Sequence, residues 1–231
     1  MTITYRLDSN ITQFYGLGHI RNVVESVKVD KKTLDYYKLA KSKSTSVAWI
    51  ASNCYSAGRS EYIKKLGEFI KLQLFGNCPK HTKCGKTCYK DVAKNNKFYF
   101  AAENSLCKDY ISEKPWRALE VGMIPVVYGY GNYSQVLPHN SFIDVRDFES
   151  PRLLATYLNK VANNKTLYNS YFKWRDTFVT SERKVDYICQ LCELLNQPER
   201  PKRIVKNLDI FWSQGDCINP TIFHKSVMRT S

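Results

Sequence analysis

Two apolar segments with a polar stretch and a helix-like segment between them constrain the fold of this chain more than any other feature. The apolar segments are residues 97–102 and 123–129, and residues 112–121 between them have the spacing of a helix. A strand, a helix and a second strand in this order are typical of a βαβ unit with parallel strands. The segment therefore predicts a parallel sheet with helices packed on it.

The same alternation continues on both sides of this unit. Further strands are predicted at residues 46–52, 72–75 and 141–145, and further helices at residues 59–71, 150–163, 165–178 and 184–196. Ser112 and Ser150 are expected to be N-caps, each followed closely by a proline in the first helical turn. We expect the α/β class, with a Rossmann-like parallel sheet and helices on both of its faces.

Composition agrees with a folded protein and narrows its partners. The 231 residues are 43% hydrophobic and 13% aromatic, as in globular proteins, and no apolar run approaches the roughly 18 residues of a membrane span. Residues 1–20 lack the apolar core of a signal peptide. The net charge of +14 favours anionic partners, which could be nucleic acid, an acidic membrane surface or a phosphorylated small molecule.

The polar stretch after residues 97–102 is the candidate binding site. In parallel sheets, ligands bind at the carboxyl ends of the strands, where helix N-termini offer unpaired N–H groups. Lys114 falls in the first turn of the expected helix, where a cation opposes the helix dipole. This pattern fits a lysine that holds an anion, and it fits equally well a pair of ordinary surface residues, Glu113 and Lys114.

The block "KFYFAAENSLCKDYISEK", residues 97–114, resembles the signature of the α1,3-fucosyltransferase family. It departs from the family pattern mildly, at Ala102 and Ser112. Other segments resemble the family in the same order, and the last of them resembles the subgroup that fucosylates N-glycan cores. They are "TITYRLDSNI" (2–11), "VAWIASNC" (47–54), "NYSQVLPHNSFIDVRDF" (132–148), "YNSYFKWR" (168–175) and "FWSQGDC" (211–217).

The resemblance implies the C-terminal, donor-binding half of a GT-B type glycosyltransferase. It implies that Arg59 and Lys114 contact the pyrophosphate of GDP-fucose, and that the other donor-binding residues lie near the ribose, the phosphates, the base or the fucose. Those residues are Tyr99, Glu103, Asn104, Tyr110 and Glu113.

The resemblance also implies the reaction, which is inverting α1,3 transfer of L-fucose from GDP-fucose to a glycan or glycoprotein. The chain has no Asp-x-Asp pair, so we expect side-chain cations rather than an obligatory metal to stabilise departing GDP, with a divalent metal at most stimulatory. Family members act in the lumen of the Golgi apparatus and are held to its membrane by an N-terminal anchor that this chain lacks. No nucleic acid partner is implied.

The expected organisation has three parts. Residues 1–44 resemble the connection between the two domains of the family together with a basic linker, residues 45–197 the GDP-fucose-binding domain, and residues 198–231 a C-terminal tail. The acceptor domain and its general-base carboxylate precede this region in the family. No catalytic residue is therefore identified in this sequence, and we expect the isolated chain to be inactive.

Eight cysteines allow two interpretations. Cys78, His81, Cys84 and Cys88 are close enough to hold zinc, but their spacing matches no common zinc finger. An even number of cysteines fits disulfides in an oxidising lumen, although the pairing does not follow from sequence. The candidates are Cys54, Cys78, Cys84, Cys88, Cys107, Cys189, Cys192 and Cys217.

Two alternatives to a fucosyltransferase stay open. The chain could bind GDP or GDP-fucose without turnover, or it could be a basic zinc- or nucleic-acid-binding protein. Three glycosylation sequons, at Asn10, Asn132 and Asn164, do not decide the compartment, because composition alone predicts about two by chance.

Overall fold

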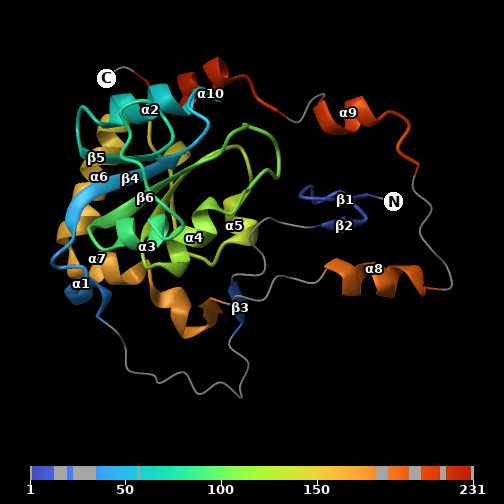
Figure 1. Ribbon diagram of the computed structural model, residues 1–231, viewed down its shortest axis with the longest axis horizontal. Coiled ribbons are helices and arrows are strands. Elements are labelled where there is room, and N and C mark those ends of the chain that lie inside the picture. Colours follow the sequence, from blue (N-terminus) through green and yellow to red (C-terminus); the bar gives the residue numbers. More distant parts are fainter. Residues whose placement is uncertain are drawn as a thin grey trace.

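A five-stranded parallel sheet with helices on both faces forms the main body of the computed structural model (Figure 1). The structure describes residues 2–12, 20–22, 35–56, 58–180, 187–197, 204–213 and 217–229. In spatial order the strands are β5 (Lys71–Gly76), β4 (Ser44–Ala51), β6 (Asn96–Ala102), β7 (Ile124–Tyr128) and β8 (Ile143–Asp144). The predicted α/β class is confirmed.

The register of the sheet is set by its apolar residues. Val47 pairs with Leu72 on one side and with Phe98 on the other, and Phe98 in turn pairs with Ile124. Every residue of β6 and β7 is buried. Continuous apolar strands of this kind are typical of parallel sheets that are covered on both faces.

One face of the sheet is covered by α2 and α6, which share a core with α7 and α10. Their bounds are α2 (Arg59–Leu66), α6 (Pro151–Asn163), α7 (Lys165–Ser170) and α10 (Pro220–Val227). Ser150 caps α6 as predicted, because its side chain accepts a hydrogen bond from the N–H group of Leu153. The short helix α1 (Tyr36–Leu39) packs against α7.

The other face carries α3 (Cys88–Ala93), α4 (Lys114–Glu120) and α5 (Tyr133–Val136). The strands contribute alternate residues to the two faces, so Phe98 and Phe100 belong to the core under α2 and α6, while Tyr99 packs with Trp116 of α4. The sheet thus separates two apolar layers.

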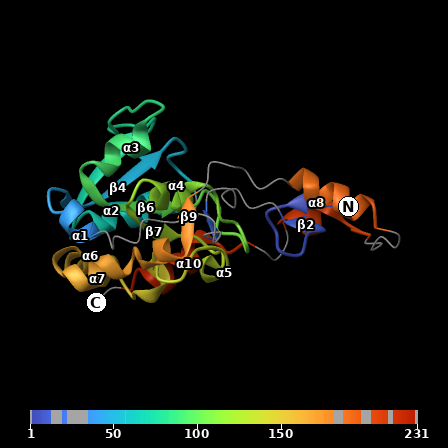
Figure 2. The same cartoon turned by 90° about the horizontal axis from the view of Figure 1, so that it is seen from below.

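Several small elements lie beside this body. The strands β1 (Ile3–Thr4) and β2 (Ile11–Thr12) pair in parallel, and β3 (Ile20–Asn22) pairs antiparallel with β9 (Phe178–Thr180). Figure 2 shows β2 and α8 (Tyr187–Leu195) apart from the sheet. In Figure 1, α9 (Leu208–Ser213) lies on the same side of the molecule. None of the helices that the structure describes is long and apolar enough to span a bilayer.

Two predicted helices are shorter than expected. The helix predicted over 59–71 ends at Leu66, and Gly67 follows as its C-cap. The helix predicted over 165–178 is wrong beyond Ser170, where the chain turns into a 3-10 helix, Lys173–Asp176, and then into β9. Phe172 and Trp174 in this segment belong to the cores on opposite faces of the sheet.

The start of α4 also differs from the prediction. The helix begins at Lys114 with Glu113 in the N-cap position, and not at Ser112. The hydroxyl oxygen of Ser112 accepts a hydrogen bond from Lys114 instead, and its N–H group donates to the Glu103 carboxylate. The helix predicted over 184–196 is present as α8 from Tyr187, while its first residues, 184–186, lie outside the described residues.

The ends of the chain are described only in part. Most of the expected basic linker, residues 23–34, lies outside the described residues. In the expected C-terminal tail, α10 packs against the main body and buries Phe223 and Val227 in its core.

Candidate functional site

The order of the strands puts a topological switch point, called the crevice below, at the carboxyl ends of β4 and β6. The chain leaves β4 toward β5 on one side of the sheet and leaves β6 toward β7 on the other, so the connections diverge between these two strands. Such a switch point is where open α/β sheets bind their ligands. The loop after β4 reaches Arg59, and the loop after β6 runs from Glu103 to Glu113.

Glu103 is the buried centre of the loop that follows β6. Its side chain is fully buried, and its two oxygens are both occupied. Oε1 accepts a hydrogen bond from the N–H group of Ser112 at 2.9 Å, and Oε2 accepts one from Nζ of Lys114 at 3.1 Å. Burial raises the pKa of Glu103, and the Lys114 charge opposes that rise.

Lys114 lies in the first turn of α4, as the sequence predicted, and is the first residue of that helix. Its ammonium group also donates to Oγ of Ser112 at 2.6 Å, and its side chain is 13% exposed. The helix has seven residues, so its dipole is a minor source of positive potential beside the ammonium group. Lys114 is therefore a held cation, close to solvent, at the edge of the crevice.

Arg59, the first residue of α2, links the two sides of the crevice. Its Nη1 donates to the carbonyl oxygen of Ala102 at 2.9 Å, and its Nη2 donates to the carbonyl oxygen of Asn53. The guanidinium group therefore joins the end of β6 to the loop after β4, and only 2% of the residue is exposed. Burial lowers the pKa of Arg59, and the nearby Glu103 opposes this. A contact with pyrophosphate, as predicted, would use another of the five N–H donors of the guanidinium group, of which Nε–H is buried without a hydrogen-bond partner among the described residues.

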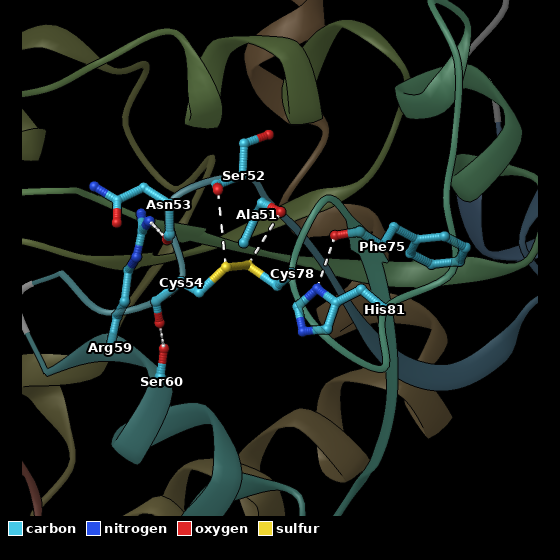
Figure 3. Close-up of a disulfide and its surroundings, with 9 residues drawn as sticks. All are labelled: Ala51, Ser52, Asn53, Cys54, Arg59, Ser60, Phe75, Cys78 and His81. Carbon is cyan, nitrogen blue, oxygen red and sulfur yellow. Dashed lines mark hydrogen bonds between the residues drawn. A yellow bond between two sulfur atoms is a disulfide. The ribbon is translucent and has the colours of Figure 1, made fainter.

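A disulfide between Cys54 and Cys78 fixes the loop that Arg59 holds (Figure 3). It joins the segment after β4 to the segment after β5, with the two Cα atoms 5.6 Å apart. Ser60, next to Arg59, donates its hydroxyl hydrogen to the carbonyl oxygen of Cys54. The backbone that presents Asn53 to Arg59 is therefore held on both sides.

The remaining predicted donor-binding residues are not all near the crevice. Asn104 and Glu113 lie half-buried at the two ends of the loop, and Tyr110 lies within it, 5.2 Å from the ring of Tyr5. Tyr99 is different, because it is fully buried in β6 and its hydroxyl oxygen lies 2.8 Å from that of Tyr89. Burial raises the pKa of Tyr99 well above its usual range.

Sequence reasoning missed the part that Ser112 plays. The residue was interpreted as a helix cap, whereas its N–H and hydroxyl groups bind the two charged residues of the site, Glu103 and Lys114. The available signal was its place two residues before Lys114 in the polar stretch.

A match to a protein-family model shows which family this chain belongs to. The model is described as the C-terminal domain of glycosyltransferase family 10 (fucosyltransferase), and it matches residues 40–211, most of the chain. The chain belongs to glycosyltransferase family 10. The predicted family is thereby confirmed.

Curated members of family 10 are similar along nearly all of this chain. Glycoprotein 3-alpha-L-fucosyltransferase A of Drosophila melanogaster is 34% identical over 91% of the chain and 42% of its own length. The rat protein 4-galactosyl-N-acetylglucosaminide 3-alpha-L-fucosyltransferase 9 is 32% identical over 92% of the chain and 57% of its own length. The chain thus spans about half the length of the curated relatives it matches.

A solved structure is also similar. An α1,3-fucosyltransferase crystallised with GDP-fucose is 20% identical, has a TM-score of 0.49, and is aligned over 55% of this chain and 38% of its own.

Six of the eight cysteines of this family 10 chain are paired in disulfides. Besides Cys54–Cys78, the structure contains Cys84–Cys88 and Cys107–Cys217. The zinc alternative is not supported, because all three of its sulfur ligands are in disulfides and Nδ1 of His81 lies 3.0 Å from the carbonyl oxygen of Phe75. No group of three or more metal-binding side chains occurs among the residues that are described. Cys189 and Cys192 lie on α8.

The three sequons of the family 10 chain lie in different settings. Oδ1 of Asn10 accepts from the N–H group of Thr2, and Oδ1 of Asn164 caps α7 by accepting from Leu167. Asn132 is exposed at the start of α5. Glycosylation at these sites stays a prediction.

Proposed function

We propose that the chain binds GDP-fucose at the carboxyl ends of β4 and β6 and takes part in α1,3-fucosyl transfer to a glycan acceptor. The observation that carries this proposal is the cation Lys114, held by Glu103 and Ser112 at the switch point of the sheet in a family 10 C-terminal domain. A nucleoside diphosphate brings negative charge to that place, and the strongly basic chain favours anionic partners.

The reaction needs the positive charge that this site supplies. The bond between the fucose anomeric carbon and the phosphate oxygen breaks, and GDP leaves with the bonding electrons. The acceptor hydroxyl oxygen attacks from the opposite face and gives its proton to a general base, a role that no residue of this chain is assigned. Lys114 stabilises the charge that develops on GDP, because a fixed cation is most effective where charge appears in the transition state.

We assign different roles to the residues that the family signature brings together. Lys114 turns from Glu103 to the pyrophosphate, while Glu103 keeps its hydrogen bond with the N–H group of Ser112 and so maintains the loop. Arg59 holds the two strand ends at the right spacing and shares one nitrogen with a phosphate. Tyr99 acts through packing in the core, because its hydroxyl group is buried against Tyr89.

Titration with GDP tests the site. Calorimetry of the 231-residue chain should show that Lys114→Ala weakens GDP binding about tenfold or more, because a hydrogen bond to a charged group is worth roughly 1.5–3 kcal/mol. Lys94→Ala is the matched control, since that lysine is exposed and pairs with Asp91 on α3. Equal GDP affinity in the wild type and in Lys114→Ala would place the donor site elsewhere.

We propose that no metal is obligatory, because Lys114 supplies the positive charge that a divalent ion supplies in other sugar-nucleotide enzymes. GDP affinity should then be the same in EDTA and in magnesium. A large loss of affinity in EDTA would contradict this part of the proposal.

We also propose that the protein works in the lumen of the Golgi apparatus. Three disulfides support an oxidising compartment, since disulfides are rare in the cytosol. Mass mapping without reduction, on protein from its own cells, should recover these three pairs. Free thiols at these six positions would argue against a lumenal protein.

A further inference from the structure

A second cleft opens beside the candidate donor site, on the side of the β1–β2 pair. It has a volume of about 430 Å³, within the roughly 300–1,000 Å³ that is usual for ligand sites. Three segments meet there: the turn between β1 and β2, the middle of the loop after β6, and the connection from β7 into α5. Its lining includes Asp8, Lys108, Asp109, Tyr130, Asn132 and Gln135.

The cleft is held by contacts between these segments. The N–H group of Leu7 donates to Oδ2 of Asp109 at 3.2 Å, which ties the β1–β2 turn to the loop after β6. Asp109 is itself in a left-handed conformation, with φ of 61°. The carbonyl oxygen of Gly131 accepts from Nη2 of Arg146 at 3.0 Å, which holds the connection after β7. The walls therefore come from three distant parts of the chain.

The lining suits a neutral, hydroxyl-rich ligand better than an anion. The two carboxylates of the lining, Asp8 and Asp109, are balanced by Lys108 and by Arg6, which pairs with Asp8 at 2.8 Å, so these groups leave no net positive charge to attract a phosphate. The amides of Asn132 and Gln135 both donate and accept hydrogen bonds, as sugar hydroxyl groups do. Tyr130 is 41% exposed and adds an apolar ring on which the C–H face of a pyranose can lie.

The position of the cleft connects it to the donor site. Lys108 and Asp109 lie in the middle of the same loop that carries Glu103 and Ser112. A side chain at Gly131 would come within 2.5 Å of Ile111, so the connection after β7 packs directly on that loop. A sugar in the cleft would therefore share its wall with the loop that holds Lys114.

We propose that this cleft binds a pyranose ring of the glycan acceptor, with Tyr130 as the stacking surface and Gln135 and Asn132 as hydrogen-bonding groups. The proposal rests on the proposed function, because it assigns a substrate to the second side of the same site. The fucose ring of GDP-fucose offers the same hydroxyl groups and C–H face as an acceptor sugar. The experiment must therefore show which of these two sugars the cleft binds.

Three probes, titrated separately into the 231-residue chain, make this separation. They are GDP, GDP-fucose and the disaccharide 4-galactosyl-N-acetylglucosamine, with saturation-transfer NMR for the disaccharide and calorimetry for the nucleotides. Tyr130→Ala and Gln135→Ala should each weaken disaccharide binding by about fivefold, the loss expected for one neutral interaction, and leave GDP binding unchanged. Tyr130→Phe should keep the disaccharide signal, because it keeps the ring. Tyr55→Ala is the control, since Tyr55 is 87% exposed and does not line this cleft.

Each outcome has one meaning. If Tyr130→Ala instead lowers GDP-fucose affinity to that of GDP and leaves the disaccharide unaffected, the pyranose is the donor fucose and the acceptor assignment is overturned. If Tyr130→Ala changes the binding of neither GDP-fucose nor the disaccharide, the cleft is not a sugar site. An N-linked glycan found at Asn132 by mass spectrometry would also overturn the proposal, because that glycan would fill the cleft. Loss of GDP binding in Tyr130→Ala makes the cleft part of the nucleotide site. If the wild-type chain binds the disaccharide but not GDP, the proposed donor site is refuted and the proposed sugar cleft is not.

Discussion

The ammonium nitrogen of Lys114 lies 3.1 Å from Oε2 of Glu103, and this ion pair joins the first residue of α4 to the residue that follows β6. The carboxylate is fully buried, and the lysine side chain is 13% exposed. A buried carboxylate is stable only with partners, whereas the lysine has access to another anion. The pair therefore keeps the loop in place and leaves a cation ready for a ligand.

Removal of Glu103 should destabilise the protein strongly. Glu103→Ala leaves the ammonium group of Lys114 and the N–H group of Ser112 without their acceptor, and loss of one partner from a buried ion pair costs about 3–5 kcal/mol. Urea unfolding measures the loss. Glu68→Ala is the control, because its pair with Lys65 is exposed and its removal should change the free energy of unfolding by less than about 0.5 kcal/mol. Similar losses in the two variants would mean that the Glu103 pair contributes no more than a surface pair.

Replacement of Arg59 by lysine should loosen the crevice. A single ammonium group cannot bridge the carbonyl oxygens of Asn53 and Ala102 as the guanidinium fork does. We expect Arg59→Lys to lower the free energy of unfolding by about 2 kcal/mol and to speed amide hydrogen exchange in residues 52–56. The exposed Arg152→Lys should change neither quantity. Unchanged exchange in residues 52–56 of Arg59→Lys would show that the disulfide alone holds that loop.

The three disulfides should differ in their contribution to stability. Their partners are separated by 4 residues for Cys84–Cys88, 24 for Cys54–Cys78 and 110 for Cys107–Cys217. Loop-closure entropy predicts about 2, 3.5 and 5 kcal/mol in that order. Urea unfolding of the three paired Cys→Ala variants measures the series. The reverse order would mean that local packing, and not chain entropy, governs their effect.

The carboxyl group of Asp35 should titrate far below its ordinary range. Hydrogen bonds from Lys165, Asn169 and the N–H group of Lys38 lower the pKa of Asp35 to about 2. Because the folded pKa is below the unfolded one, this group stabilises the fold above pH 3.8, and the stabilisation is lost as the pH falls toward 2. NMR titration of the carboxyl carbon should give a midpoint near 2 in the wild type. Lys165→Ala should raise the midpoint, while Lys160→Ala, on the exposed side of α6, should not.

The class of the fold, and the parts of the site that follow one another along the chain, could be predicted from the amino-acid sequence. Apolar runs separated by helical patterns predicted all five strands of the sheet, because parallel strands that are covered on both faces are mostly apolar. The polar stretch from Glu103 to Lys114 follows β6, as predicted. It therefore lies at the carboxyl end of a strand, where parallel sheets bind their ligands. The family signature pointed to the same residues.

The contacts that these residues make with distant parts of the chain could be found only from the three-dimensional structure. Arg59 of α2 donates to Ala102 at the end of β6, Tyr99 is buried in the core, and Leu7 donates to Asp109, which is 102 residues away in the sequence. The pairing of the cysteines likewise required the strand order, because Cys54 and Cys78 come together only when β5 lies beside β4. Contacts between distant segments depend on how strands are ordered in space, and a local pattern of apolar and polar residues does not carry that order.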